Sequence, residues 1–291
     1  RPSPKISPAR TCMANSPASG SIAEGSGSLL SNGGRIAWTD WNANELINAL
    51  LLGGSDVTVG VNTVALNGTT NVTVAHNLGA APDIILAFTM GVAAGAATGV
   101  RWSQGFYDVA GNTYACLTNR NDAGQATTTL NQALYTDCLA SEIAASRTWF
   151  ATYVSADATN VTLVANAATT DVLSLVFIKV TGGAFKVGTF LTKTSTGTQA
   201  DISGMAAKPK AVFYLPSFLT SANGLETIIS ATTCESTGLG VAADNEGVTE
   251  QASAAMFSDD AVVLGSTVSK CYISNTKAGV TFNGSGTLGV E

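Results

Sequence analysis

The chain has few charged residues and a single histidine, and each shortage excludes a class of protein. Charged residues make up 12% of its 291 residues, about half the usual share. Long solvated helices need charged side chains along an exposed face, so a helical bundle is excluded. The lone histidine, His76, argues against a zinc enzyme and against histidine-based acid–base catalysis. We expect His76 to occupy a polar position at the end of a strand.

Sequence motifs of catalysis and metal binding are also missing. The chain contains no GxSxG, HExxH or P-loop motif. It has five cysteines, an odd number without any CxxC pair, which favours buried free thiols over a disulfide framework or a zinc site. We therefore expect a protein that is not an enzyme, with no catalytic residues, cofactor or bound metal.

A few carboxylates invite a functional interpretation. Asp137 and Asp259 lie within similar sequences, "ALYTDC" and "AMFSDD", but one such residue in each half need not form a catalytic pair. Capping of turns is the expected role. The segments "NRNDAG" and "DNEG" resemble fragments of calcium loops, which need more oxygen ligands than these segments supply. A β-turn is favoured for both.

The net charge of −6 limits the possible partners. A surface of that sign repels phosphate backbones, so we expect no nucleic-acid partner. Residues 84–100 are uncharged, but the run is Ala- and Gly-rich after Met90, whereas a membrane-spanning helix needs about 20 strongly apolar residues. We interpret this run as a strand that leads into a loop, and expect no membrane partner.

The N-terminal residues differ from the rest in charge. Residues 1–35 contain four basic residues against Glu24 alone, in a segment rich in Pro, Ser and Gly. Such an arm could dock on an acidic partner, or it could be a disordered tail or linker. From Asp40, the run "DWNANELINALLLGG" predicts a short helix that packs on its own domain or on a partner. The candidate partner-binding residues of this segment, residues 1–54, are Arg1, Lys5, Arg10, Arg35, Trp38 and Trp41.

The residues that are abundant favour strands and turns. Val and Thr are typical of strands, whereas Gly and Asn are typical of turns. Segments such as "TNVTVAH", "NVTLVA" and "VLSLVFIKV" are short, and several alternate between apolar and polar residues. They predict an all-β chain built from antiparallel β-sandwiches of the jelly-roll type.

One phrase occurs twice in the chain. "NLGAAPDIILAF" at residues 77–88 and "GMAAKPKAVFYL" at residues 204–215 each place a proline just before an apolar run. Proline is tolerated at the start of a strand, so Pro82 and Pro209 predict strand starts. The repeat predicts two tandem sandwiches, at residues 55–183 and 184–291.

A cluster of aromatic residues is the remaining candidate for ligand binding. The stretch "RWSQGFY" contains Arg101, Trp102, Phe106 and Tyr107. On an exposed loop these side chains could stack on a sugar or anchor a protein partner. In a strand they would serve core packing, which is the favoured alternative.

Together, the proline turn, the strands "DIILAF" and "KAVFYL", the Gly-rich polar middle and the closing strand "VLSLVFIKV" resemble the tandem domains of phage and prophage structural proteins. The resemblance implies a virion component on the particle exterior, which assembles with other virion proteins and with copies of itself. It implies a capsid decoration protein docked through its N-terminal arm. The alternative is a tail-fibre module that binds a host receptor or glycan.

Overall fold

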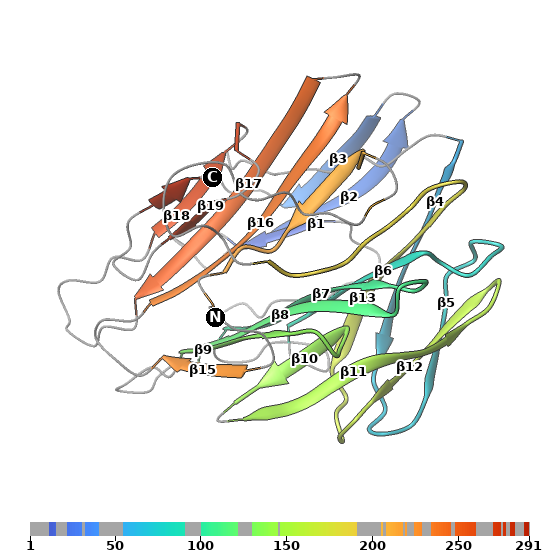
Figure 1. Cartoon of the computed structure of the whole chain (residues 1–291), viewed down its shortest axis with the longest axis horizontal. Coiled ribbons are helices and arrows are strands. Elements are labelled where there is room, and N and C mark those ends of the chain that lie inside the picture. The colour runs from blue at the N-terminus through green and yellow to red at the C-terminus, as the bar shows by residue number, and fades with distance from the viewer. Residues whose placement is uncertain are drawn as a thin grey trace.

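The protein is described from a computed structural model. The residues described are 12–15, 22–30, 33–40, 55–90, 100–121, 130–144, 146–190, 205, 208–217, 219, 224–228, 234–245, 248–259, 270–274, 276–277, 280–282 and 288–290. Over these ranges every regular secondary-structure element is a β-strand, and all pairings between strands are antiparallel (Figure 1). The prediction of an all-β chain is therefore confirmed.

Two of the sheets form a two-layer, sandwich-like body. One layer has the strand order β15-β9-β8-β7-β6-β13-β4, and the other has the order β10-β11-β12-β5. Strands of the first layer are β4 (Val57–Ala65), β6 (Ile84–Thr89), β7 (Val100–Asp108), β8 (Thr113–Asn121), β9 (Leu130–Tyr135), β13 (Val172–Val180) and β15 (Gly224–Ile228). Strands of the second layer are β5 (Val72–Ala75), β10 (Ala140–Ile143), β11 (Arg147–Ala156) and β12 (Asn160–Ala165).

The alternating sequence pattern explains why the two layers pack face to face. In β12 every second residue is buried, which places Val161 and Leu163 in the core. In β13 the same period of two buries Leu173, Leu175 and Phe177. These side chains and those of the facing strands form one hydrophobic cluster between the layers.

Pro82 marks a strand start as predicted. Pro82 lies two residues before β6, which runs between β7 and β13 inside the larger sheet. The carbonyl of Asp83 accepts a hydrogen bond from Val109, and its carboxylate accepts one from the Val180 amide at 2.8 Å. Bonding to the neighbouring strands therefore begins one residue after the proline, which itself has no amide to offer.

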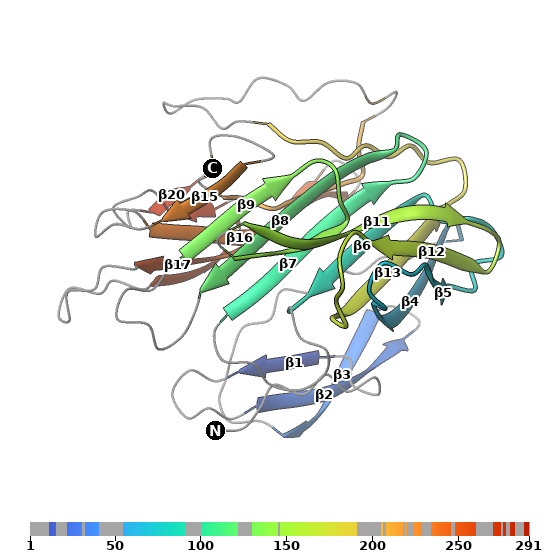
Figure 2. The same cartoon turned by 90° about the horizontal axis from the view of Figure 1, so that it is seen from below.

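The N-terminal segment is more regular than the predicted arm. Its described residues form a three-stranded antiparallel sheet in the order β1-β2-β3, from Cys12–Asn15, Ile22–Leu30 and Gly33–Asp40. Figure 2 shows these blue strands apart from the two sheets of the body. The expected extended arm is thus corrected to a small sheet over these residues. Asp40, the predicted helix cap, ends β3, and residues 41–54 lie outside the described residues.

The second proline of the repeated phrase also precedes a strand, but that strand has a different place in its sheet. Pro209 again precedes a strand, β14 (Ala211–Tyr214), but β14 lies at the edge of the sheet β14-β16-β17-β18. The other strands there are β16 (Cys234–Asn245), β17 (Val248–Asp259) and β18 (Lys270–Ser274), and β19 (Val280–Phe282) pairs with β20 (Leu288–Val290). β15 instead pairs with β9 of the first half. A strand from beyond the proposed boundary between residues 183 and 184 therefore belongs to a sheet of the first half. The tandem division stays a prediction.

Candidate functional site

The predicted ligand-binding residues lie within β7, where successive side chains point to opposite faces. Arg101 faces the second layer, since its Nη1 bonds to Glu142 of β10 at 2.9 Å. Tyr107 shares that face, is 1% exposed and stacks on Tyr114 with ring centroids 4.2 Å apart. Tyr107 therefore has the core-packing role that was the favoured alternative.

The other two residues of this set point away from the second layer. Phe106 lies 6.3 Å from the ring of Phe213 in β14, so it packs toward the second half of the chain. Trp102 is half-buried on the same face as Phe106. The four residues are thus split between two faces of an internal strand and do not form one surface. Their ligand-binding role stays a prediction.

Of the predicted partner-binding residues, the structure describes the backbone of two. Arg35 and Trp38 lie in β3, opposite Ser28 and Gly25 of β2. Arg1, Lys5, Arg10 and Trp41 lie outside the described residues. The N-terminal sheet thus carries one basic and one aromatic member of the set.

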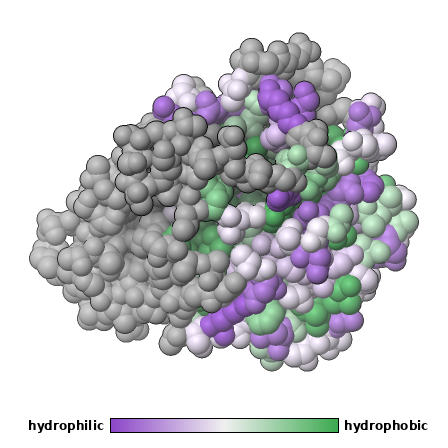
Figure 3. All heavy atoms as spheres, in the orientation of Figure 1, coloured by the Kyte–Doolittle hydropathy of each residue, from purple (hydrophilic) through white to green (hydrophobic). Residues whose placement is uncertain are grey.

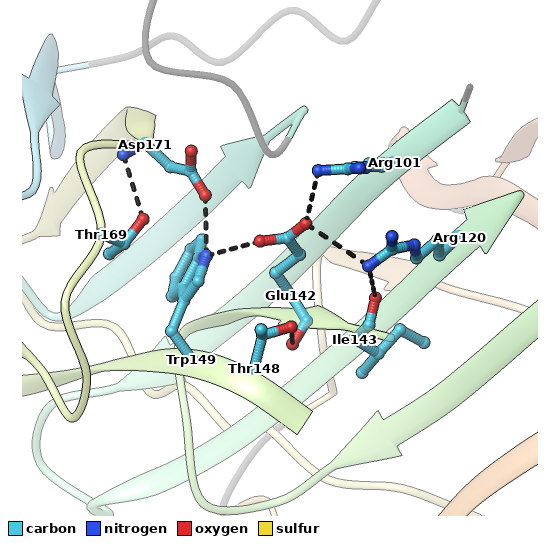
Figure 4. Close-up of polar contacts among 8 residues, drawn as sticks. All are labelled: Arg101, Arg120, Glu142, Ile143, Thr148, Trp149, Thr169 and Asp171. Carbon is cyan, nitrogen blue, oxygen red and sulfur yellow. Dashed lines mark hydrogen bonds and ion pairs between the residues drawn. The ribbon is translucent and has the colours of Figure 1, made fainter. Parts of the chain in front are cut away.

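A polar cluster of the body surrounds Glu142 (Figure 4). Its side chain is only 13% exposed, and its Oε1 accepts a hydrogen bond from Arg101. Arg120 Nη1 lies 3.8 Å from the same oxygen and donates to the carbonyl of Ile143 at 3.0 Å. Because Arg101 and Arg120 belong to β7 and β8, this carboxylate of β10 ties the two layers together.

A tryptophan links Glu142 to a second carboxylate. Trp149 Nε1 lies 3.0 Å from Glu142 Oε2 and 2.7 Å from Asp171 Oδ2, so the indole N–H is shared by two acceptors. The indole ring itself is buried in the core. The Asp171 amide donates a hydrogen bond to Thr169 Oγ1 at 3.2 Å, which holds Asp171 in place before β13.

Burial sets the protonation behaviour of Glu142. Loss of water raises the pKa of Glu142, and the charge of Asp171 raises it further. Arg101, Arg120 and the Trp149 hydrogen bond oppose this shift but do not cancel it. Relative to its protonated form, the ionised form of Glu142 is therefore less favoured in the folded protein than in the unfolded chain.

This shift predicts a pH dependence with a definite sign. A raised folded-state pKa means that the folded protein binds the proton more tightly, so its stability rises as pH falls. We expect the wild type to gain stability relative to Glu142→Gln between about pH 7 and about pH 4, where free Glu titrates. Chemical denaturation of both proteins across this range checks the prediction.

An exposed carboxylate provides a control of opposite sign. Hydrogen bonds from the amides of Thr159 and Asn160, both 2.7 Å, lower the pKa of Asp157. Its contribution is present above the unfolded-state pKa of about 3.9 and is lost as pH falls further. The advantage of the wild type over Asp157→Asn should therefore shrink between about pH 5 and about pH 3. Equal trends for both variants would contradict the assigned shifts.

A second polar cluster is buried between β7, β8 and β10. Ser103 Oγ lies 3.2 Å from Cys116 Sγ and accepts hydrogen bonds from Thr118 Oγ1 and the Ser141 amide. Cys138 belongs to the same region, and both cysteines are buried free thiols, as predicted for them. Burial raises the pKa of Cys138 and so disfavours its thiolate in the folded state.

The remaining polar candidates also have structural partners. His76 is buried, its Nδ1 accepts a hydrogen bond from the Leu78 amide at 3.2 Å, and its ring packs near Phe177. Asp137 forms an ion pair with Arg147 at 2.8 Å. The side chain of Asp259, its proposed equivalent, lies outside the described residues.

A shallow pocket lies where β6 begins and β7 and β13 end. Its lining includes Asp83, Asp108 and Phe185. The carboxylate of Asp83 pairs with Lys179 at 2.7 Å, and Asp108 Oδ1 accepts a hydrogen bond from the Gly111 amide. Both acids are therefore engaged in holding strand ends and turns. Within the described ranges, no group of three or more His, Cys, Asp or Glu side chains is placed to hold a metal ion.

Comparisons with protein-family models, curated proteins and solved structures found no match. In the described part of the chain, no helix has the length and apolar character that a membrane crossing requires. The resemblance to phage structural proteins therefore stays a prediction from the sequence.

Proposed function

We propose that this chain is a non-enzymatic structural component of a phage virion. In this proposal it is a decoration protein on the capsid exterior, anchored to other virion proteins through its N-terminal segment. The motifs around Pro82 and Pro209 and the β-rich fold support the proposal. The proposal includes association with copies of itself, for which closed symmetry is the common arrangement.

The observation that carries the proposal is the separate pairing of the N-terminal strands. β1, β2 and β3 pair with one another, and none of them belongs to a sheet of the body. A segment of this kind can bind a partner without opening the ladders of the body. Arg35 and Trp38 lie on it, and arginine and tryptophan are enriched at the centres of protein interfaces.

The polar groups of the body support a structural role for the same chain. The Glu142 and Ser103 clusters bond across the two layers and so stabilise the sandwich from within. On the face shown in Figure 3, polar and apolar side chains are interspersed over the described part. A projecting body with a mixed surface of this kind suits a protein that remains exposed on a particle.

Deletion of the N-terminal segment tests this function. Removal of residues 1–40 should reduce the occupancy of the protein on purified particles by at least about tenfold, which corresponds to about 1.4 kcal/mol of binding free energy. Occupancy is measured by quantitative mass spectrometry of particles, and circular dichroism checks that the shortened chain retains its strands.

A matched pair of point variants separates the segment from general charge effects. Arg35→Ala removes a positive charge from β3, whereas Lys210→Ala removes one that pairs with Asp244 in the second half. We expect weaker particle binding for Arg35→Ala and unchanged binding for Lys210→Ala. Full occupancy of the folded deletion variant would refute anchoring through this segment.

A further inference from the structure

Among the strands that the structure describes, the larger sheet ends at a long strand with no partner on its outer side. β4 pairs with β13 over Val57–Ala65 without a bulge, and it is the last strand in the order of that sheet. Its sequence, "VTVGVNTVA", contains no charged residue and no proline. Proteins normally block such an edge with lysine, proline, a bulge or a covering segment.

Backbone hydrogen bonds show which groups of β4 face the open edge. The Asp56 carbonyl accepts from the Thr181 amide, and the Leu66 amide donates to the Asp171 carbonyl. Even-numbered residues therefore direct their amides and carbonyls toward β13, and odd-numbered residues direct theirs away from it. Consistent with this, the Thr63 amide donates to the side chain of Asn62 and not to β13.

The same odd-numbered residues carry exposed apolar side chains. Val61 is 72% exposed and Val59 is 41% exposed, and both point away from the second layer. The even-numbered Val64 packs against the core instead. Edge-facing backbone groups and apolar side chains thus coincide along one edge of the body.

We propose that β4 pairs with β4 of a second copy, antiparallel, about a two-fold axis at Val61. Val61 lies at the centre of the nine-residue strand. An antiparallel register centred there sets Val61 opposite itself, Val59 opposite Thr63 and Val57 opposite Ala65. The hydrogen-bonded pairs of this register then join odd-numbered residues, whose amides and carbonyls face the edge and can form the ladder between the copies once the Thr63 amide exchanges its bond to Asn62.

The side chains favour a second copy as the occupant. Facing residues in this register are β-branched or small, a combination that packs well across strands. Asp56, the charged residue beside β4, falls opposite Leu66 and does not meet its own copy. The seam therefore avoids like-charge repulsion although the whole chain carries a net charge of −6. This inference specifies the self-association in the proposed function and rests on it, but it does not depend on where the protein binds a particle.

Light scattering on the full chain tests the self-association. The wild type should have the mass of a dimer at about 100 µM, and Val61→Lys should shift it to the monomer, because edge lysines oppose strand pairing. Val154→Lys is the matched control, since Val154 is 45% exposed but lies in β11, between β10 and β12. A monomeric wild type at this concentration, or a Val61→Lys protein with unchanged mass, would overturn the proposal.

Cysteine cross-linking tests the register. Val61→Cys should form a disulfide-linked dimer when diamide oxidises the two thiols, because facing Cα atoms in a hydrogen-bonded antiparallel pair lie about 5.5 Å apart, within the reach of a disulfide. Val59→Cys alone should give no more dimer than the wild type on a non-reducing gel. The double variant Val59→Cys with Thr63→Cys should give more disulfide-linked dimer than the wild type, because these two positions face each other. Equal cross-linking of the Val61 and Val59 single variants would overturn the proposed axis. These assays need no particle, so their failure would leave the deletion test unaffected.

Discussion

Substitution of Gly105 by alanine should lower the free energy of unfolding by at least about 3 kcal/mol, the range of severe overpacking in a core. Gly105 lies in β7, where the chain approaches the residues just before β10. An alanine Cβ would lie 1.8 Å from the carbonyl oxygen of Leu139 and 2.8 Å from its carbonyl carbon. Because the obstacle is backbone, no change of rotamer relieves the clash, and the two layers must separate locally.

Gly188→Ala is the matched control for this prediction. A Cβ at Gly188 would meet no atom within 4 Å, so we expect a change within about 0.5 kcal/mol. Urea denaturation of the three proteins, followed by fluorescence, measures the difference. A Gly105→Ala protein as stable as the wild type would show that β7 and the Leu139 backbone are not in close contact.

Trp149→Phe is expected to cost about 2–4 kcal/mol of stability, since the penalty for an unsatisfied buried group is larger when the group is charged. The substitution keeps an aromatic ring in the core and removes the N–H that Glu142 and Asp171 share. Both carboxylates then lose a donor while they remain close to each other. We also expect a further rise in the pKa of Glu142, because its hydrogen bond to Trp149 lowers that pKa in the wild type.

Two measurements distinguish this effect from a general loss of packing. Trp102→Phe makes the same chemical change at a half-buried position, on the face of β7 that points away from the second layer. We expect it to cost less than about 1 kcal/mol of stability. The double variant Trp149→Phe with Glu142→Gln should be destabilised by less than the sum of the single variants, because the two residues are coupled. Strict additivity would contradict a shared hydrogen bond.

The sequence predicts much of the first body because alternation of apolar residues depends on local chemistry. "NVTLVA" and "VLSLVFIKV" correspond to β12 and β13, whose inward residues are buried as the period of two requires. Pro82 marks the start of β6 because a residue without an amide is tolerated only before the ladder begins. These features follow from single segments and need no knowledge of their neighbours.

Contacts between distant segments could not be predicted in the same way. Glu142 lies in a nearly uncharged stretch, and an isolated acid in an apolar strand is the one signal that it is buried with partners. Nothing in the sequence identifies those partners, because Arg101 and Asp171 lie far along the chain. The role of Gly105 likewise depends on the path of the segment before β10, which no local pattern specifies.

The N-terminal strands and the partial repeat illustrate the same limit. β2 and β3 contain "GSGSLL" and "GGRIAW", in which glycine and serine have low strand propensity, so pairing between the segments outweighs local preference. In the second half, β15 pairs with β9 at the end of the larger sheet, and β14 pairs directly with β16. Strands of similar sequence therefore pair with different neighbouring strands, because the whole fold decides the pairing.

Electron cryo-microscopy of particles purified from cells that make this chain tests the central proposal most directly. A structural role on the virion predicts repeated β-sandwich density on the outer surface of the capsid, with the N-terminal sheet at the contact and the larger body projecting outward. Particles whose capsid surface lacks this density, although the folded protein is abundant in the same cells, would contradict it.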